Sequence, residues 1–392
     1  MRKKDLPVQV VRGIRASGLH PGSQPTRLRI PPSRRLGEKF AVPLLVLPKQ
    51  SDVLIVSLHA ALSRRRLPRF EWLRSMHGRP ESQLYISDPT LQLSPTLANG
   101  FYLGDDEEDL TPRLARIVRR TAAAIGATRV VLVGYSGGAF AAARIGSQLA
   151  GSVALVFVAR RSLGDPPLGH TVPLLDTVFP GHAGFEALHR RLGARVSLAD
   201  TIPADSDQKL VWIQNSGDED HRIHQFEPFC KDMGLPLEGG VSSAGTVHLV
   251  STYYGDGHFP PPIEYWQRCL DEAVAYARWD SFSAPVWDQD APRPDPETPL
   301  STEVAAPSID GCGGEPGLPK GFAGLVGRAT PDDLVCVHLD GALHRTVPVG
   351  ADGSWRVTPR SFAGRLLQVR AFAHRPGVGR SDDAMAAFVL VE

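Results

Sequence analysis

The sequence predicts an α/β fold with a doubly wound, mostly parallel sheet, followed by a small all-β domain. Four apolar runs between residues 53 and 215 are nearly continuous rather than alternating, which is typical of parallel strands covered on both faces. Helical patterns separate these runs, and such alternation favours a parallel sheet flanked by helices. After residue 320 the runs become short and alternate between apolar and polar residues, which indicates antiparallel strands.

Caps, prolines and apolar spacing mark the helices of the first part. Thr111 can cap a helix whose first turn holds Pro112 and whose apolar face holds Leu114, Ile117 and Val118. Another helix is expected after FPPP, where apolar residues recur at spacings of three and four. The strands expected between the helices are VLIVSL (53–58), RVVLVG (129–134), VALVFVA (153–159) and LVWIQN (210–215).

A proline-rich stretch divides the chain. Eight prolines fall between residues 285 and 319, mixed with polar residues and glycines, so we expect a semi-rigid linker there. Residues 1–284 then form the larger domain, with its core at about 40–280, and residues 320–392 form a β-sandwich. The stretch VPVGADGSWRVTP resembles a hairpin of bacterial Ig-like modules, which implies an Ig-like tail. The tail strands are expected at LVCVHL (334–339), RTVPVG (345–350), WRVTP (355–359), LLQVRAFAH (366–374) and AAFVLVE (386–392).

Composition and charge exclude several classes of function. The formal charge is +1, from 43 basic and 42 acidic residues, so no overall electrostatic field favours the binding of nucleic acid. Basic clusters at 1–40 and 63–74 are interpreted as solvated faces. The four cysteines form no C-x-x-C pair, which argues against a zinc ribbon or a disulfide framework. No segment has the apolar core of a secretory signal or the length of a membrane span. We therefore expect a soluble cytoplasmic protein with no cofactor and no nucleic-acid partner.

The stretch GYSGG, residues 134–138, carries the clearest chemical signal. It satisfies G-x-S-x-G directly after a predicted buried strand and before a helical pattern, which is the context of a nucleophilic serine on a tight turn. Glycines at 134 and 138 leave clearance where a side chain would collide with the adjoining strand or helix. Ser136 is therefore the predicted nucleophile, and Gly137 the predicted oxyanion donor at the helix N-terminus. A dinucleotide site is the competing interpretation, but G-x-G-x-x-G is absent and no acidic residue ends the next strand.

The chain from about residue 40 to 280 resembles the α/β-hydrolase superfamily, in which the serine is followed along the chain by an acid and then by a histidine. The resemblance rests on GYSGG, on LVWIQNSGDEDHRI, and on the strand-like HLVSTYY followed by GDGHFPPP. It implies a triad of Ser136, Asp220 and His258. Asp218 is the close competitor for the acid, because either carboxylate could reach a histidine across the top of the sheet.

The resemblance also covers the loop after the first predicted strand and the segment before LVWIQN. It implies a second oxyanion donor at Ala60 or Ala61, where many relatives carry His-Gly and this chain has His59-Ala60. His59 is interpreted as a structural residue of that loop. The segment at about 160–208 lies where the family inserts a lid or cap, so we expect it to shape the substrate pocket.

A metal site is another interpretation of the stretch after LVWIQN. Asp218, Asp220, His221 and His224 offer oxygen and nitrogen ligands within seven positions. Because the triad already explains the carboxylates, no metal is predicted.

Together these residues predict a serine hydrolase or acyltransferase that acts on an ester, thioester or amide through an acyl-enzyme. NGFYLGD, GYSGGAFAAA and GDGHFPPP look like hydrolase-like proteins of bacterial capsule and accessory-secretion systems, which implies a small-molecule or glycan-linked acyl substrate. The alternative is a hydrolase-fold protein without catalysis that binds or scaffolds a partner. The C-terminal β-domain is the expected docking surface for a protein partner.

Overall fold

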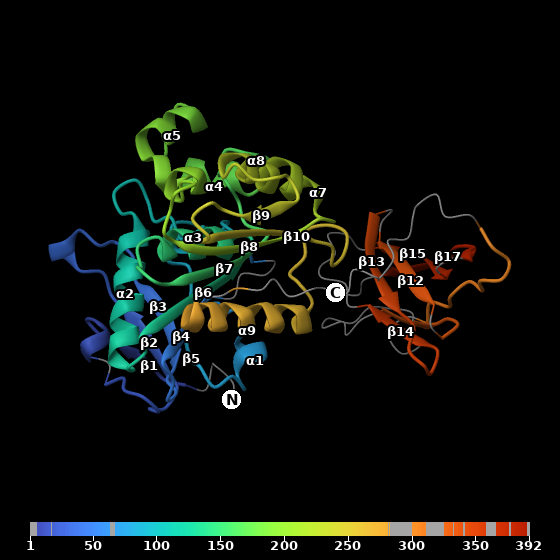
Figure 1. Cartoon of the computed structure of the whole chain (residues 1–392), viewed down its shortest axis with the longest axis horizontal. Helices are drawn as coiled ribbons and strands as arrows, with labels where there is room; N and C mark the ends of the chain where they lie inside the picture. Colours follow the sequence, from blue (N-terminus) through green and yellow to red (C-terminus); the bar gives the residue numbers. More distant parts are fainter. Residues whose placement is uncertain are drawn as a thin grey trace. The chain divides into compact units, whose positions relative to one another are not determined.

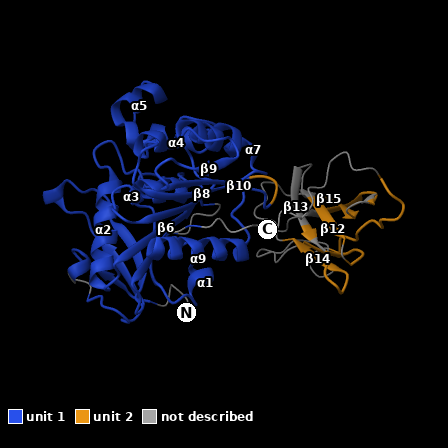
Figure 2. Ribbon diagram, in the orientation of Figure 1, with its two compact units in different colours: residues 1–254, 258–287 blue, residues 255–257, 288–392 orange. Residues whose placement is uncertain are grey.

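The computed structural model of the chain divides into two compact units (Figure 2). The first comprises residues 1–254 and 258–287, and the second comprises residues 255–257 and 288–392. Most of the predicted linker at 285–319 lies outside the residues that the structure describes. The described residues are 6–16, 18–62, 67–280, 282, 300–310, 325–331, 333–339, 342–357, 366–375 and 378–389.

A mixed sheet of ten strands forms the centre of the first unit (Figure 1). Its strands are β1 (Val8–Val10), β2 (Thr26–Ile30), β3 (Val42–Leu47), β4 (Val53–Leu58), β5 (Ser82–Ile86), β6 (Arg129–Tyr135), β7 (Val153–Phe157), β8 (Lys209–Asn215), β9 (Gly239–Val241) and β10 (Val247–Thr252). They lie in the order β1-β2-β3-β5-β4-β6-β7-β8-β10-β9. Neighbours from β5 through β10 in this order are parallel, whereas β2-β3, β3-β5 and β10-β9 are antiparallel. The predicted mostly parallel sheet is therefore confirmed.

Helices cover both faces of this sheet. They are α1 (Leu73–Met76), α2 (Leu110–Ala124), α3 (Gly137–Gly146), α4 (Thr171–Val178), α5 (Phe185–Leu192), α6 (Leu198–Thr201), α7 (Glu219–His221), α8 (Glu227–Asp232) and α9 (Ile263–Trp279). Short 3-10 turns occur at Ile14–Ala16, Arg34–Leu36, Pro89–Gln92 and Gly193–Arg195, and a π-helical turn at Arg222–Phe226. Figure 1 shows α1 and α9 on one side of the sheet and α3, α4 and α8 on the other.

Alternate residues of the central strands face different helical layers. Leu54, Val56 and Leu58 of β4 share a core with α2 and α3, whereas Val53 and Ile55 share another with α1 and α9. Every residue of β4 and of β7 is buried. Coverage on both faces explains why these strands appear in the sequence as continuous apolar runs.

Helix α2 begins slightly earlier than the sequence predicts. Asp109, rather than Thr111, is its cap, because the Asp109 carboxylate accepts a hydrogen bond from the Thr111 backbone N–H over 2.9 Å. The predicted apolar face at Leu114, Ile117 and Val118 is buried in the core.

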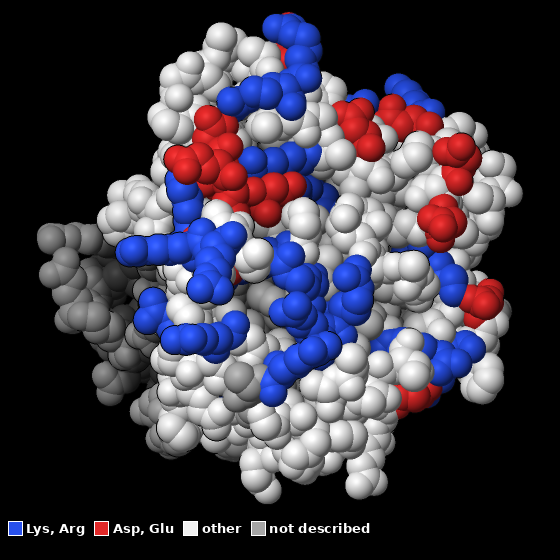
Figure 3. Space-filling model, turned by 90° about the vertical axis from the view of Figure 1, so that its left-hand side faces the viewer, with Lys and Arg blue, Asp and Glu red and all other residues white. Residues whose placement is uncertain are grey.

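The face of the first unit that carries α2 holds charges of both signs. Figure 3 shows a broad group of Lys and Arg beside smaller groups of Asp and Glu. Some of the basic side chains on this unit are paired, since Lys39 Nζ lies 2.9 Å from an Asp105 oxygen and 2.7 Å from a Glu107 oxygen. Exposed pairs of this kind contribute little to stability.

Two further sequence expectations concern the membrane and the cysteines. Across the part of the chain that the structure describes, no helix has both the length and the apolar content of a membrane span. Cys230 and Cys269 are buried free thiols, Cys336 is buried, and Cys312 lies outside the described residues.

The second unit consists of two small antiparallel sheets. Strands β12 (Leu334–Leu339), β13 (Ala342–Pro348), β15 (Leu366–Arg375), β16 (Gly379–Arg380) and β17 (Ala384–Val389) form one sheet, and β11 (Leu325–Arg328) pairs with β14 (Ser354–Val357) in the other. Both sheets contribute to one apolar core, which includes Leu325, Val335, Val337, Trp355 and Val357. The predicted small all-β domain is confirmed, and its Ig-like character stays a prediction.

Candidate active site

Ser136 lies in a strained turn between β6 and α3. Strand β6 ends at Tyr135 and α3 begins at Gly137, so a single residue reverses the direction of the backbone. The backbone angles of Ser136 are φ +54° and ψ −117°, which non-glycine residues adopt only under strain. The strand-turn-helix arrangement predicted for GYSGG is therefore present.

The glycines on either side of Ser136 are required by backbone contacts. A Cβ at Gly134 would lie 2.2 Å from the carbonyl oxygen of Gly138, and a Cβ at Gly138 would lie 2.4 Å from that of Leu58. Backbone atoms cannot move aside as a flexible side chain can, so both positions need glycine. The second contact also shows that the end of β4 runs directly against the start of α3.

Three side chains form a hydrogen-bonded chain at one edge of the sheet. The Ser136 hydroxyl donates to Nε2 of His258 over 2.9 Å, and Nδ1 of His258 donates to Oδ2 of Asp218 over 2.5 Å. Ser136 follows β6, Asp218 lies beyond the end of β8, and His258 lies beyond the end of β10. These strands are parallel, so their carboxyl ends meet at the same edge and bring together residues that are distant in sequence.

The carboxylate that contacts His258 belongs to Asp218 and not to Asp220. Asp218 caps α7 and is 3% exposed, whereas Asp220 lies in the first turn of α7 and is exposed to solvent. The contact with His258 that we expected of Asp220 is made instead by Asp218, the alternative acid. The physical reason is the cap, which turns the Asp218 side chain back over the helix N-terminus toward the site.

Hydrogen bonds keep the Asp218 carboxylate ionised although it is buried. Burial alone would raise its pKa, but the hydrogen bonds from His221 and His258 outweigh burial and hold the pKa of Asp218 well below its ordinary value. The charged carboxylate accepts the hydrogen bond from Nδ1 of His258 and so orients its ring.

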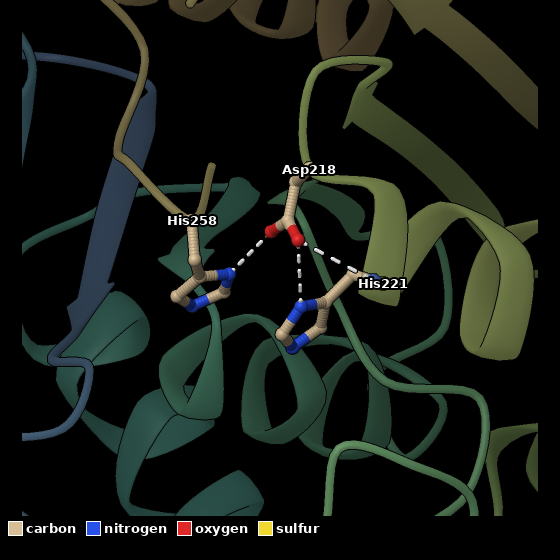
Figure 4. A group of neighbouring side chains, drawn as sticks. All are labelled: Asp218, His221 and His258. Carbon is tan, nitrogen blue, oxygen red and sulfur yellow. Dashed lines mark hydrogen bonds and ion pairs between the residues drawn. The ribbon is translucent and has the colours of Figure 1, made fainter. Parts of the chain in front are cut away.

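His221 is a site residue that the sequence suggested only as a metal ligand. Its Nδ1 donates to Oδ1 of Asp218 over 3.1 Å, and its backbone N–H donates to the same oxygen over 3.3 Å. Its ring stacks on the ring of His258, with centroids 4.1 Å apart and an interplanar angle of 20°. Figure 4 shows the Asp218 carboxylate between the two imidazoles. The D-x-x-H spacing at a helix start is the signal that could have predicted this contact, since a cap residue and the third helical residue face each other.

Buried hydrogen bonds fix the loop after β4. The His59 backbone N–H donates to the Tyr102 hydroxyl over 2.8 Å, and Nε2 of His59 accepts from the Asp88 backbone N–H over 3.0 Å. Its Nδ1 lies 2.8 Å from the carbonyl oxygen of Ala60, and burial lowers its pKa, so the ring is neutral with its proton on Nδ1. These contacts match the structural role expected of His59, and they hold the backbone that continues to Ala60 and Ala61.

Asn99 is a second residue that the sequence did not single out. A Cβ at Gly137 would lie 2.3 Å from Nδ2 of Asn99, so this amide packs directly on the first residue of α3. Its Oδ1 accepts from the Phe101 backbone N–H over 3.2 Å, which orients Nδ2 as a donor. Because Asn99 precedes a glycine in an irregular loop, no periodicity or spacing in the sequence indicated its place.

A metal-like cluster exists, but with a different composition from the one weighed in the sequence. One ligand atom each of Asp218, His221 and His258 lies within 4.8 Å of the others, whereas Asp220 and His224 are exposed. The hydrogen bonds to Asp218 already account for this closeness. Nothing in the geometry therefore requires an ion.

The segment at 160–208 connects β7 to β8 and contains α4, α5 and α6. Arg160, at its start, is 5% exposed and donates to the backbone carbonyl oxygens of Asp165, over 3.1 Å, and of Pro167. Gln225 anchors the same turn by donating to the carbonyl oxygens of Asp165 and Pro166, over 3.0 Å and 2.7 Å. These bonds fix the beginning of the segment, and its role as a cap stays a prediction.

The architecture defines a class of protein. The fold is that of an α/β-hydrolase. It has a mostly parallel sheet covered by helices on both faces, and a serine on a strained strand-to-helix turn. An acid and a histidine follow later in the chain. This confirms the fold class that the resemblance implied.

Comparisons with known proteins found similar structures but no similar sequence. No family model and no curated protein matches the sequence. The capsule O-acetyltransferase of Neisseria meningitidis serogroup A has a similar structure, with 12% identity, a TM-score of 0.43 and coverage of 60% of this chain and 88% of that one. The glycosylation-associated Gap123 complex of Streptococcus agalactiae is 12% identical, with a TM-score of 0.46 and coverage of 65% of this chain and 47% of that one. An acetyl xylan esterase of Paenibacillus sp. R4 is 14% identical, with a TM-score of 0.40 and coverage of 60% of this chain and 80% of that one. At such identities the likeness concerns the fold alone.

Proposed function

We propose that the chain is a serine hydrolase or acyltransferase that cleaves an ester, thioester or amide through an acyl-enzyme on Ser136. The observation that carries this proposal is the hydrogen-bonded series of Ser136, His258 and Asp218, with distances of 2.9 and 2.5 Å. Each side chain is supplied by a separate segment, and the bonds have the directions that general-base activation of a hydroxyl requires.

The acylation step follows from these directions. His258 accepts the Ser136 proton at Nε2 while Oγ forms a bond to the carbonyl carbon of the substrate. The resulting imidazolium is stabilised by the Asp218 carboxylate, and it gives its proton to the leaving group as the carbon–heteroatom bond breaks. Water or an alcohol then attacks the acyl-enzyme by the same route, with His258 taking the proton of the attacking group and returning it to Ser136 Oγ.

Backbone and amide donors stabilise the negative charge that develops on the carbonyl oxygen. The N–H of Gly137 makes no hydrogen bond within the helix, because Gly137 belongs to the first turn of α3. The positive end of the helix dipole adds to the stabilisation of a negative charge there. The loop at Ala60 and Ala61 runs beside this turn and supplies the second backbone donor. Nδ2 of Asn99, packed on Gly137, is a further donor at the same helix start.

Covalent labelling tests this proposal. A fluorophosphonate probe reacts with an activated serine hydroxyl, so we expect it to label the folded wild-type chain but not Ser136→Ala. His258→Ala should label at least about a hundredfold more slowly, because the general base is missing. Ser147→Ala is the matched control, since Ser147 lies at the other end of α3 and donates its hydroxyl to the Arg144 carbonyl oxygen.

The outcomes separate the two candidate functions. Labelling that requires Ser136 and His258 supports the enzyme. A folded wild-type chain that does not react supports a binding or scaffolding protein with a hydrolase fold. Labelling that persists in Ser136→Ala shows that a different serine is the nucleophile.

A further inference from the structure

Asp218 holds two imidazoles, and the acylation chemistry uses only one of them. His258 contacts Oδ2 of the carboxylate and His221 contacts Oδ1, so each oxygen serves one ring. The His221 side chain is 6% exposed. Its second ring nitrogen is not among the buried polar atoms that lack a partner, so it reaches the surface of the site and is available to a ligand.

Both rings have the same tautomer. A carboxylate accepts hydrogen bonds, so Nδ1 must carry the proton in His221 as it does in His258. Burial lowers the pKa of His221, with positive charge on His258 and Arg160 acting in the same direction and Asp218 opposing it. The neutral ring therefore has a lone pair on Nε2. Within the described part of the chain, no group donates a hydrogen bond to this atom.

The two Nε2 atoms lie side by side. Figure 4 shows that both rings direct Nδ1 toward the Asp218 carboxylate and Nε2 toward the same side, away from it. The rings are stacked, with centroids 4.1 Å apart and an interplanar angle of 20°, so the two Nε2 atoms are neighbours. Nε2 of His258 receives the Ser136 hydroxyl. The free acceptor of His221 therefore lies next to the position where the alcohol part of an ester leaves or attacks.

We propose that Nε2 of His221 accepts a hydrogen bond from a second hydroxyl of the alcohol, so that the site selects vicinal diols such as sugars. This inference rests on the proposed acyl-enzyme mechanism. Oxygens on adjacent carbons are separated by about the length of a hydrogen bond, roughly 2.8 Å, so two neighbouring acceptors can receive one hydroxyl each. A simple alcohol leaves the His221 acceptor without a partner.

The transfer step balances without a proton change on His221. The reacting hydroxyl gives its proton to Nε2 of His258 while its oxygen bonds to the acyl carbon. The bond from that carbon to Ser136 Oγ breaks, and His258 returns the proton to Oγ. The adjacent hydroxyl only donates a hydrogen bond to His221, so His221 positions the alcohol and determines specificity.

Competition between two alcohols for one acyl-enzyme tests this inference. The chain is supplied with a chromogenic aryl acetate, and equal concentrations of cyclohexane-1,2-diol and cyclohexanol compete for the acetyl group. One hydrogen bond contributes about 1.4 kcal/mol, so we expect about tenfold more diol monoacetate than cyclohexyl acetate, beyond the statistical factor of about two. Because both products come from the same acyl-enzyme, any change in acylation rate cancels in the ratio.

Two variants distinguish contact with the alcohol from support of Asp218. His221→Asn retains an N–H donor at the position of Nδ1 but lacks Nε2, and we expect the product ratio to fall to the statistical value. His224→Asn, at an exposed histidine three positions later, should keep the wild-type ratio.

The inference is overturned if the product ratio of the wild-type chain does not exceed the statistical factor of about two, or if no acetyl group is transferred to the diol. It is also overturned if His221→Asn still transfers the acetyl group preferentially to the diol. His221 would then only support the Asp218 carboxylate and would not contact the alcohol. The failure of the proposed function has a different signature, namely no labelling of Ser136 and no release of the aryl alcohol.

Discussion

Replacing Asp218 by asparagine gives the sharpest test of the triad. The two N–H donors of His221, at 3.1 and 3.3 Å, both point at Oδ1, so the oxygen of the new amide takes that position. The amide NH₂ group then faces His258, where the carboxylate oxygen had been at 2.5 Å from Nδ1. His258 must accept at Nδ1 and carry its proton on Nε2, which cannot receive the proton of Ser136.

The expected loss follows from this wrong tautomer. An Asp-to-Asn change of the same kind in a serine protease lowers kcat by about 10⁴, which corresponds to about 5.5 kcal/mol of transition-state stabilisation. Asp220→Asn should stay within about twofold of wild type, because Asp220 is exposed and does not contact His258. The volume of the side chain is unchanged in both variants, so packing does not contribute to the difference.

The assay is the initial rate of aryl acetate hydrolysis, with fluorophosphonate labelling as a second measure. Circular dichroism and thermal unfolding show whether each variant is folded. If Asp220→Asn loses as much activity as Asp218→Asn, or if Asp218→Asn retains more than about a tenth of the wild-type rate, the assignment of the acid is refuted.

Two further predictions concern the turn and the effect of acid. Gly138→Ala should abolish labelling and lower the melting temperature, because its Cβ would lie 2.4 Å from a backbone oxygen. Gly78→Ala is the control and should resemble wild type, because nothing lies within 4 Å of a Cβ at that position. If the two variants behave alike, the backbone contact at Gly138 is contradicted. The free energy of unfolding should fall as the pH drops from about 5 toward 2, because the lowered pKa of Asp218 means that the unfolded chain binds its proton first. Asp218→Asn should show a shallower fall in urea titrations over this range, and parallel curves would show that Asp218 does not contribute.

The central strands could be predicted from the sequence because both of their faces are covered. β4 has the bounds of the run VLIVSL, and β6 and β8 differ from their runs by one residue. Two other strands of the sheet, β1 and β5, gave no such signal. All three residues of β1 are exposed, and β5 begins with Ser82 and Gln83, which are buried only because Lys49 and Met76 offer backbone partners. Those partners are distant in sequence, so local hydropathy cannot show them.

The places of Ser136 and His258 in the fold could be predicted because each has a local signature, a glycine-flanked serine and a histidine in a glycine loop after a strand. The choice between Asp218 and Asp220 could not be made locally. Both follow β8, and the cap of α7 determines which carboxylate turns inward. Asn99 and His221 became site residues only through contacts made by the folded chain, with Gly137 in one case and His258 in the other.

Ser136 and His258 are 122 positions apart, and Asp218 precedes His258 by 40. No fragment that ends before β10 can contain all three groups, and none can align them before β6, β8 and β10 stand in one sheet. Under the mechanism that we propose, a nascent chain therefore has no acyl-transfer activity until nearly the whole first unit has been synthesised. If refolding is followed by the proposed esterase reaction, we expect activity to return only after β6, β8 and β10 have paired. The rate of that return then measures how fast this part of the sheet forms.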